Sequence, residues 1–145
     1  MNDIGMDQPA NPTAGNIFTL LHAFHALEDR VEASLAEVGL SMPKYSVLNE
    51  LVSAGKPLSL SDLATRLSCV KSNMTQLIDR LETDGLVRRV DDPADRRSVK
   101  AAVTKDGQAR HAAGQTEIDR LNKQFASRVG AHERTAVERL LSAIK

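Results

Sequence analysis

LSLSDLATRL (residues 58–67) and SCVKSNMTQLIDRLE (residues 68–82) are the two stretches that decide the fold of this chain of 145 residues. In the first stretch, Leu63, Ala64 and Leu67 can share one face of a short helix that is capped by Ser59 or Ser61. In the second stretch, the apolar residues have the i, i+3, i+4, i+7 spacing of a buried helical face, namely Met74, Leu77, Ile78 and Leu81. The pattern therefore predicts two helices joined by a tight turn.

A strand signal follows directly after the second helix. The segment DGLVRR (84–89) places Gly85 where a left-handed helix cap belongs, and residues 86–90 and 98–103 are predicted as two antiparallel strands around the turn DPAD (92–95). Arg96 and Arg97 stand at or near the tip of this hairpin. Two helices joined by a tight turn and followed by a basic hairpin are typical of a winged helix-turn-helix, whose second helix enters the major groove of DNA.

The regions on both sides of this unit are predicted to be helical. Apolar residues recur at three- and four-residue steps from residue 16 to a stop near Gly39, and Ser41 caps a second helix that has Pro43 in its first turn. Thr104 caps a fifth helix, and a sixth follows Gly130. The apolar stripes of the first, fifth and sixth helices exceed what the DNA-reading unit needs to cover. We therefore expect these helices to pack into a dimerisation region.

The chain thus divides into three parts with a mainly α fold and a small β-hairpin wing. Residues 1–15 are poor in apolar side chains and are predicted to be a disordered tail. Residues 41–103 are expected to form the winged helix-turn-helix DNA-binding region. Residues 16–40 and 104–145 are expected to form the helical dimerisation region.

Charge and composition narrow the possible functions. The 19 basic and 19 acidic residues give a formal net charge of zero, so DNA affinity must come from local groups of cations. The single cysteine excludes an intramolecular disulfide, and no apolar signal core or membrane-spanning run is visible, which favours a reducing cytoplasmic location. The sequence contains no glycine-rich phosphate loop, nucleophile with an orienting base, or paired carboxylates, so we expect neither an enzyme nor a cofactor.

From about residue 17 to residue 144 the chain resembles the MarR family of bacterial transcription regulators. Five segments carry the resemblance in order: LAxxL (63–67), KSNMTQLIDRLE (71–82), DGLV (84–87), DxR (95–97) and VTxxG (103–107). One departure is Val103, where the family more often has leucine. The resemblance implies a homodimer on a pseudo-palindromic operator of double-stranded DNA, commonly a repressor relieved by a small molecule or an oxidant. It also implies an effector pocket between the dimerisation helices and the DNA-binding lobe.

Helical geometry separates the DNA-facing side of residues 71–83 from the apolar side. Because successive residues turn by about 100°, the side opposite Met74 and Ile78 carries Ser72, Gln76 and Asp79. Recognition helices meet base edges through their N-terminal turns, and Asn and Gln can bond adenine in two places. The expected base contacts are Ser72, Asn73 and Gln76. The expected phosphate contacts, which set register without reading sequence, are Lys71, Thr75 and Arg80.

The wing is expected to make a second contact with DNA. The resemblance carries a minor-groove contact over to Arg97, which Asp95 would pair with or orient, and it leaves the direction of Arg96 open. Side chains alternate between the two faces of a strand. Arg88 and Arg89 therefore cannot both face DNA.

Five residues are candidates for detecting a signal. Cys69 lies in the turn before the recognition helix, where oxidation would make the regulator redox-responsive, although this turn usually holds a small buried residue and cysteine packs well there. The candidates for lining the effector pocket are His22, His25, Tyr45 and His111. A metal site needs three or four converging ligands, and the histidines are too dispersed to predict one.

A winged-helix module that binds another protein instead of DNA is the alternative function. Such a module should lose the polar and cationic residues of its recognition helix and wing. This chain keeps them, including Asn73, Gln76 and Arg97, so DNA binding is the favoured interpretation.

Overall fold

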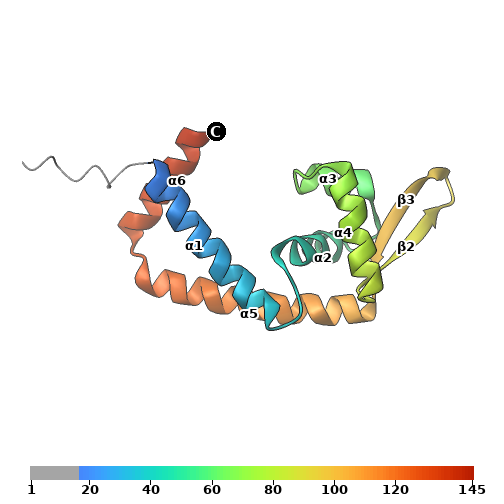
Figure 1. Cartoon of the computed structure of the whole chain (residues 1–145), viewed down its shortest axis with the longest axis horizontal. Coiled ribbons are helices and arrows are strands. Elements are labelled where there is room, and N and C mark those ends of the chain that lie inside the picture. Colours follow the sequence, from blue (N-terminus) through green and yellow to red (C-terminus); the bar gives the residue numbers. More distant parts are fainter. Residues whose placement is uncertain (1–16) are drawn as a thin grey trace, which may run out of the picture.

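The computed structural model describes residues 17–145, and the tail predicted for residues 1–15 lies outside them. In this part of the chain, six helices and three strands follow one another (Figure 1). They are α1 (Ile17–Ala36), α2 (Met42–Ala54), β1 (Leu58–Ser59), α3 (Leu60–Arg66), α4 (Lys71–Thr83), β2 (Val87–Asp92), β3 (Asp95–Val103), α5 (Lys105–Arg128) and α6 (Ala131–Ile144). The mainly helical fold with a β wing is confirmed.

Helices α2, α3 and α4 and the sheet form one lobe around a single apolar core. In α4, Met74, Ile78 and Leu81 are fully buried and Leu77 is half-buried, as the helical spacing predicts. Burying an aliphatic side chain of this size stabilises the fold by roughly 1.5–3 kcal/mol relative to leaving it exposed. This apolar face therefore sets the rotation of α4 and leaves its polar face on the surface.

Side-chain caps begin three of the helices at the predicted residues. Ser41 Oγ accepts from the backbone N–H of Lys44 at 3.3 Å, and Thr104 Oγ1 accepts from that of Gly107 at 3.0 Å. Of the two serines predicted for α3, Ser59 is the cap, with Oγ 3.0 Å from the backbone nitrogen of Asp62. Gly85 has the expected left-handed backbone, with φ of 74°.

The sheet has one strand more than the predicted hairpin. Its order is β1-β3-β2, and β1 pairs antiparallel with β3 through Leu58 and Ala101. Two residues are too few to show a period-2 pattern, so this strand had no sequence signal of its own. The wing strands are also longer than predicted, because β3 begins at Asp95 and the turn between the strands is only Pro93 and Ala94. Arg96 and Arg97 consequently belong to a strand instead of a loop.

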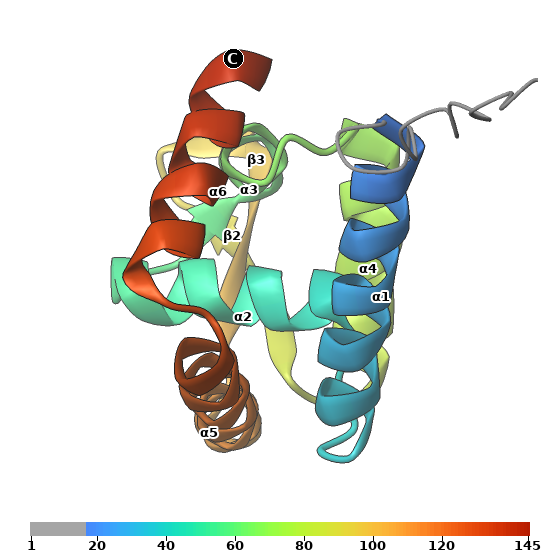
Figure 2. The same cartoon turned by 90° about the vertical axis from the view of Figure 1, so that its left-hand side faces the viewer.

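Helices α1, α5 and α6 form a helical stem that extends away from the lobe. Helix α5 runs from the base of the wing to the far end of the molecule (Figure 1). α1 contacts α5 and α2, and Arg30 Nη2 donates to Gln124 Oε1 at 3.3 Å. At the far end, α1 and α6 stand apart from each other (Figure 2), and every residue of α6 is exposed. The apolar stripes of α1 and α6 are therefore left largely uncovered within one chain. None of the described helices is long and apolar enough to cross a membrane.

Candidate nucleic-acid interface

The exposed face of α4 carries the residues of this helix that were predicted to contact DNA. The six side chains on this helix that were assigned to bases or phosphates are exposed: Lys71, Ser72, Asn73, Thr75, Gln76 and Arg80. The hydroxyl of Thr75 donates to the backbone oxygen of Lys71 at 3.1 Å, so its one proton is used within the helix here. A phosphate contact from Thr75 would require that hydroxyl to rotate.

The N-terminus of α4 differs from those of α2, α3 and α5. Its N-cap residue is Val70, and within the described chain no side chain accepts a hydrogen bond from its first turn. The N–H groups at the start of a helix have no partner in the helix itself, and the helix dipole makes this end favourable for anions. In α4 these N–H groups lie beside Lys71 and Ser72, on the exposed side of the lobe. The arrangement is suited to a phosphate of a nucleic-acid backbone.

The wing and the start of α4 face a common hollow of about 290 Å³. Lys71 and Thr75 line it from α4, and Arg89 and Arg97 line it from the wing. The structure thus brings together candidates that are well separated in sequence. No acidic residue is among those that line this hollow.

Asp95 acts on the wing through the backbone. Its Oδ1 accepts from the backbone N–H of Arg97 at 2.9 Å, so of the two roles predicted for Asp95 the structure supports orientation. On the other side of the turn, Asp92 Oδ1 accepts from the N–H of Ala94 at 3.0 Å, and this bond, together with nearby Lys100, holds the pKa of Asp92 below its usual value. The side chains of Arg96 and Arg97 are exposed and make no ion pair with the described residues.

Arg89 connects the wing to α4 through two carboxylates, an interaction that we call the Arg89 bridge. Its Nη2 lies 2.5 Å from Asp79 Oδ1, its Nη1 lies 3.0 Å from Glu82 Oε1, and its backbone N–H donates to Glu82 Oε2 at 2.9 Å. The bond to Asp79 is the main reason that the pKa of Arg89 is raised. Arg88 is exposed and lines a different hollow, which confirms that the two arginines face opposite ways. Sequence reasoning missed the bridge because Asp79 and Arg89 meet only when the strand runs back along the helix.

Tyr45 and His111 are the two effector-pocket candidates that the structure brings together. Their rings are stacked, with centroids 5.4 Å apart and planes 7° from parallel. The Tyr45 hydroxyl donates to Gln115 Oε1 at 2.7 Å, and His111 Nε2 lies 3.0 Å from Asn49 Oδ1. Burial lowers the pKa of His111 and raises that of Tyr45, so both rings are uncharged near neutral pH.

The other two effector-pocket candidates lie elsewhere. His22 and His25 are on the exposed part of α1, where His25 Nδ1 is 3.5 Å from Glu28 Oε2. Among the described residues, no hydrogen bond, ion pair or ring contact joins His22 or His25 to the Tyr45–His111 pair. Within residues 17–145 no group of three or more His, Cys, Asp or Glu residues is arranged to hold a metal ion.

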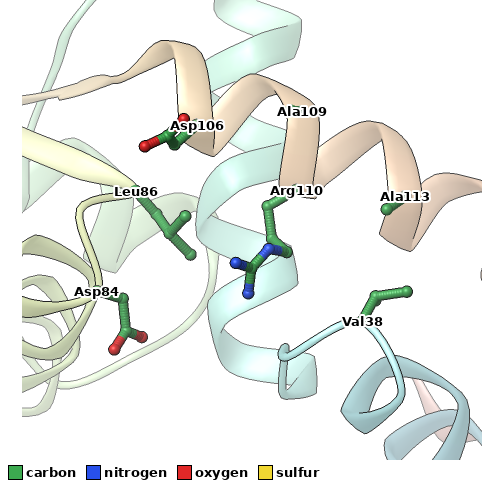
Figure 3. A pocket seen from close by; sticks show the side chains of 7 residues that line it. All are labelled: Val38, Asp84, Leu86, Asp106, Ala109, Arg110 and Ala113. Carbon is green, nitrogen blue, oxygen red and sulfur yellow. The ribbon is translucent and has the colours of Figure 1, made fainter.

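A hollow of about 400 Å³ lies where the stem meets the end of α4 (Figure 3). Arg110 of α5 extends into the space between Asp84 and Val38, and its Nη1 donates to the backbone oxygen of Gly39 at 3.5 Å. Asp84 Oδ2 accepts a hydrogen bond from Lys44 Nζ at 2.6 Å. With Asp84 and Asp106 among its lining residues, this hollow is not suited to an anion.

Cys69 is half-buried in the turn before α4. Its thiol donates to the backbone oxygen of Val70 at 3.4 Å, and it lines a largely apolar hollow of about 300 Å³ with Met42 and Leu77. These contacts fit a packing role. A redox response through Cys69 stays a prediction.

A helix-turn-helix followed by a β wing and carried on a helical stem defines the class of winged helix-turn-helix proteins. Residues 40–99 match the model of the MarR family, and the chain belongs to this family.

Similar proteins include the HTH-type transcriptional regulator PrsX of Escherichia coli, which is 31% identical over 102 residues that make up 68% of this chain and 61% of PrsX. Among solved structures, AbsC of Streptomyces coelicolor, a MarR family transcriptional regulator, superposes with a TM-score of 0.77 at 29% identity and covers 88% of this chain and 87% of its own. A mutant of MarR from E. coli, complexed with operator DNA, shares the fold with a TM-score of 0.77 at 22% identity, over 88% of this chain and 91% of that one. The chain spans about 54–61% of the length of the first curated relatives that it matches.

Proposed function

We propose that this chain is a transcriptional regulator that binds double-stranded DNA sequence-specifically as a homodimer on a pseudo-palindromic operator. In this proposal it acts as a repressor that a small molecule relieves. The observation that carries the proposal is the exposed polar face of α4, whose first turn has no side-chain cap and which lies beside a cationic wing.

In the proposed complex, α4 lies in the major groove. Its first two turns present Ser72, Asn73 and Gln76 to base edges, where the amides of Asn and Gln can form paired hydrogen bonds with adenine. Lys71, Thr75, Arg80 and the uncapped N–H groups are assigned to phosphates. Because Lys71 and Arg97 line one hollow, a DNA backbone could pass between α4 and the wing while Arg97 reaches the minor groove. Arg96 is assigned to the same wing contact, and Asp95 keeps the wing in shape.

The apolar surface of the stem supports the homodimer. Phe18 is 71% exposed, Ile144 is 69% exposed and Leu141 is 53% exposed, and they come from the two ends of the described chain that reach the same end of the molecule (Figure 1). Large apolar side chains left exposed at the end of a helical stem favour an interaction surface. A second copy would cover it symmetrically and would set two copies of α4 about one helical turn of DNA apart.

Binding to the DNA that flanks the chain's own gene tests the proposal. We expect specific binding that survives a scrambled competitor and weakens as salt is raised, because phosphate contacts release counterions. Arg97→Ala should weaken the complex by about tenfold or more, which corresponds to about 1.4 kcal/mol. Lys105→Ala, which removes an exposed cation at the start of α5, is the matched control and should leave affinity within about twofold.

Two results would contradict parts of the proposal. Equal affinity of the parent and Arg97→Ala proteins would exclude the wing contact. Weak binding of any sequence at low salt would favour the protein-interaction module instead.

A further inference from the structure

Val70 is the most exposed large apolar side chain of the lobe. Within residues 17–145, all but two of the exposed large apolar side chains belong to the stem helices α1, α5 and α6. The two exceptions are Val70, which is 67% exposed, and Val99 on wing strand β3, which is 37% exposed. A single exposed valine is ordinary on a protein surface. The position of Val70 in its helix is what requires an explanation.

Val70 is the N-cap residue of α4, a position at which valine is unfavourable. Helices prefer Ser, Thr, Asp or Asn there, and α2, α3 and α5 begin with Ser41, Ser59 and Thr104. A polar cap favours the folded state by about two- to thirtyfold over an apolar residue. Because Val70 is also exposed, neither capping nor burial accounts for a valine at this position.

The turn before α4 directs the side chain of Val70 outward. Ser68 has a φ of 50°, in the left-handed region, and the backbone N–H of Cys69 donates to the backbone oxygen of Ala64 at 2.8 Å. Cys69 is consequently half-buried and packs against the core, whereas the next residue faces solvent. The backbone oxygen of Val70 accepts from the N–H of Met74 at 3.0 Å, so the first turn of the helix fixes its position.

The start of α4 is the end of the helix that points away from α5. The other end adjoins the start of α5, where Thr104 Oγ1 donates to the backbone oxygen of Gly85 at 2.7 Å. Figure 1 shows the start of α4 and the tip of the wing on the side of the lobe opposite α5. Asn73, which is exposed and assigned to base edges, follows Val70 by about one helical turn. In the proposed complex Val70 therefore enters the major groove beside the base-reading side chains.

We propose that Val70 reads a thymine in each half-site of the operator by packing against its C5-methyl group. This inference rests on the proposed function and adds an apolar base reader to the polar ones. In the major groove thymine presents a methyl group, so an apolar contact distinguishes T·A from the other base pairs. The contact also covers a side chain that the free protein leaves in water, which strengthens binding through the hydrophobic effect.

An operator for the test is selected from a pool of random DNA duplexes by the full parent chain. Each thymine of the selected operator is then replaced singly by deoxyuridine, which lacks the methyl group and keeps the O4 acceptor. Fluorescence anisotropy measures the Kd of each duplex. In each half-site we expect one thymine whose replacement weakens parent binding by about three- to fivefold, the effect of one buried methyl group.

Val70→Ala removes the apolar contact without supplying a cap, because alanine is also a poor N-cap residue. It should weaken binding to the thymine operator by about threefold or more and should no longer distinguish thymine from deoxyuridine at that position. Val99→Ala is the matched control, since it shortens the other exposed valine of the lobe, and it should keep the parent's preference there.

Val70→Ser separates the DNA contact from folding. Serine supplies the missing cap, so the urea midpoint of this variant should rise above that of the parent. Its preference for thymine over deoxyuridine should nevertheless be lost.

Two outcomes would overturn the inference. One is an operator on which no single deoxyuridine weakens binding of the parent chain. The other is a Val70→Ala protein that keeps the parent's preference at every thymine. A selection that enriches no sequence would contradict the proposed regulator function and this inference with it, whereas an enriched operator without a thymine preference would contradict this inference alone.

Discussion

Gly107 has no room for a side chain. A Cβ atom at this position would lie 2.0 Å from the backbone oxygen of Leu86 and 2.8 Å from Val103 Cγ2. Three residues earlier, Thr104 caps the helix and also donates from Oγ1 to the backbone oxygen of Gly85 at 2.7 Å. The segment VTKDG (103–107) thus brings the start of α5 against the junction of α4 and β2.

Gly107→Ala should destabilise the protein because backbone, and not a flexible side chain, stands in the way. We expect a loss of about 1–3 kcal/mol in the free energy of unfolding, measured by urea denaturation. Gln108→Ala, at the exposed neighbouring position, should stay within about 0.5 kcal/mol of the parent. Equal stability of the two variants would show that α5 can shift away from Leu86 at no cost.

His111 should make stability depend on pH. Burial lowers its pKa in the folded chain, so the unfolded chain binds a proton more readily than the folded chain just below the ordinary histidine pKa of about 6.5. The stabilising contribution of the neutral ring is present above that value and is lost as pH falls toward the lowered pKa.

Urea denaturation at pH 7.5 and pH 5.5 checks this expectation. The free energy of unfolding should fall with pH in the parent protein, and His111→Gln should reduce the fall. His132→Gln, at an exposed position of α6, is the control and should show the parent's pH dependence. A fall of the same size in all three proteins would assign it to other groups.

At the scale of secondary-structure elements, the Arg89 bridge couples the wing to the recognition helix. Asp79 lies on the polar face of α4, where an unpaired carboxylate would repel DNA phosphates. Arg89 balances that charge and the charge of Glu82. Since all three groups are partly exposed, the bridge contributes only about 0–1 kcal/mol to folding. Its larger effect should be on DNA binding.

Arg89→Ala should therefore lower operator affinity by about tenfold or more while changing stability by less than about 1 kcal/mol. Fluorescence anisotropy with labelled operator and urea denaturation measure the two quantities. Adding Asp79→Asn to Arg89→Ala should recover part of the affinity, because the uncompensated carboxylate is then gone. If the double variant binds no better than Arg89→Ala, Arg89 acts by contacting DNA itself.

At the scale of the whole molecule, the lobe has its own core and the stem does not. The fully buried large side chains lie in the lobe, such as Leu48 and Ile78, or at the end of α1 that packs against the lobe, such as Leu35. None of the described residues of α6 is buried. α6 stands at the end of α5 with Val137, Leu140 and Leu141 exposed. An amphipathic helix without a covered face is stable when another surface packs on it.

Leu141→Glu should convert the proposed dimer to a monomer, because it places a charge in the apolar face of α6. Sedimentation velocity should show about half the mass, and operator affinity should fall steeply because two half-sites are no longer bound together. Ser142→Lys, at an exposed polar position beside it, is the control and should remain dimeric. A parent protein that sediments as a monomer would contradict the homodimer outright.

The amino-acid sequence by itself determined the elements whose signals are local. The apolar spacing of Met74, Ile78 and Leu81 placed α4 and its buried face. The caps at Ser41, Ser59 and Thr104 each bind a backbone N–H within four residues along the chain. The polar face that carries the candidate DNA contacts follows from the same helical period, since the face opposite a buried stripe must be exposed.

Tertiary structure alone decided the features that join distant residues. Strand β1 exists because β3 pairs with it, and Arg89 meets Asp79 because the wing runs back along α4. Lys56 and Arg88 line one hollow that the end of α2, the wing and α5 enclose together. Periodicity and capping depend on neighbours three or four residues away, so a sequence displays them. Charge pairing and enclosure depend on which surfaces the core brings into contact, and only the packed chain specifies that.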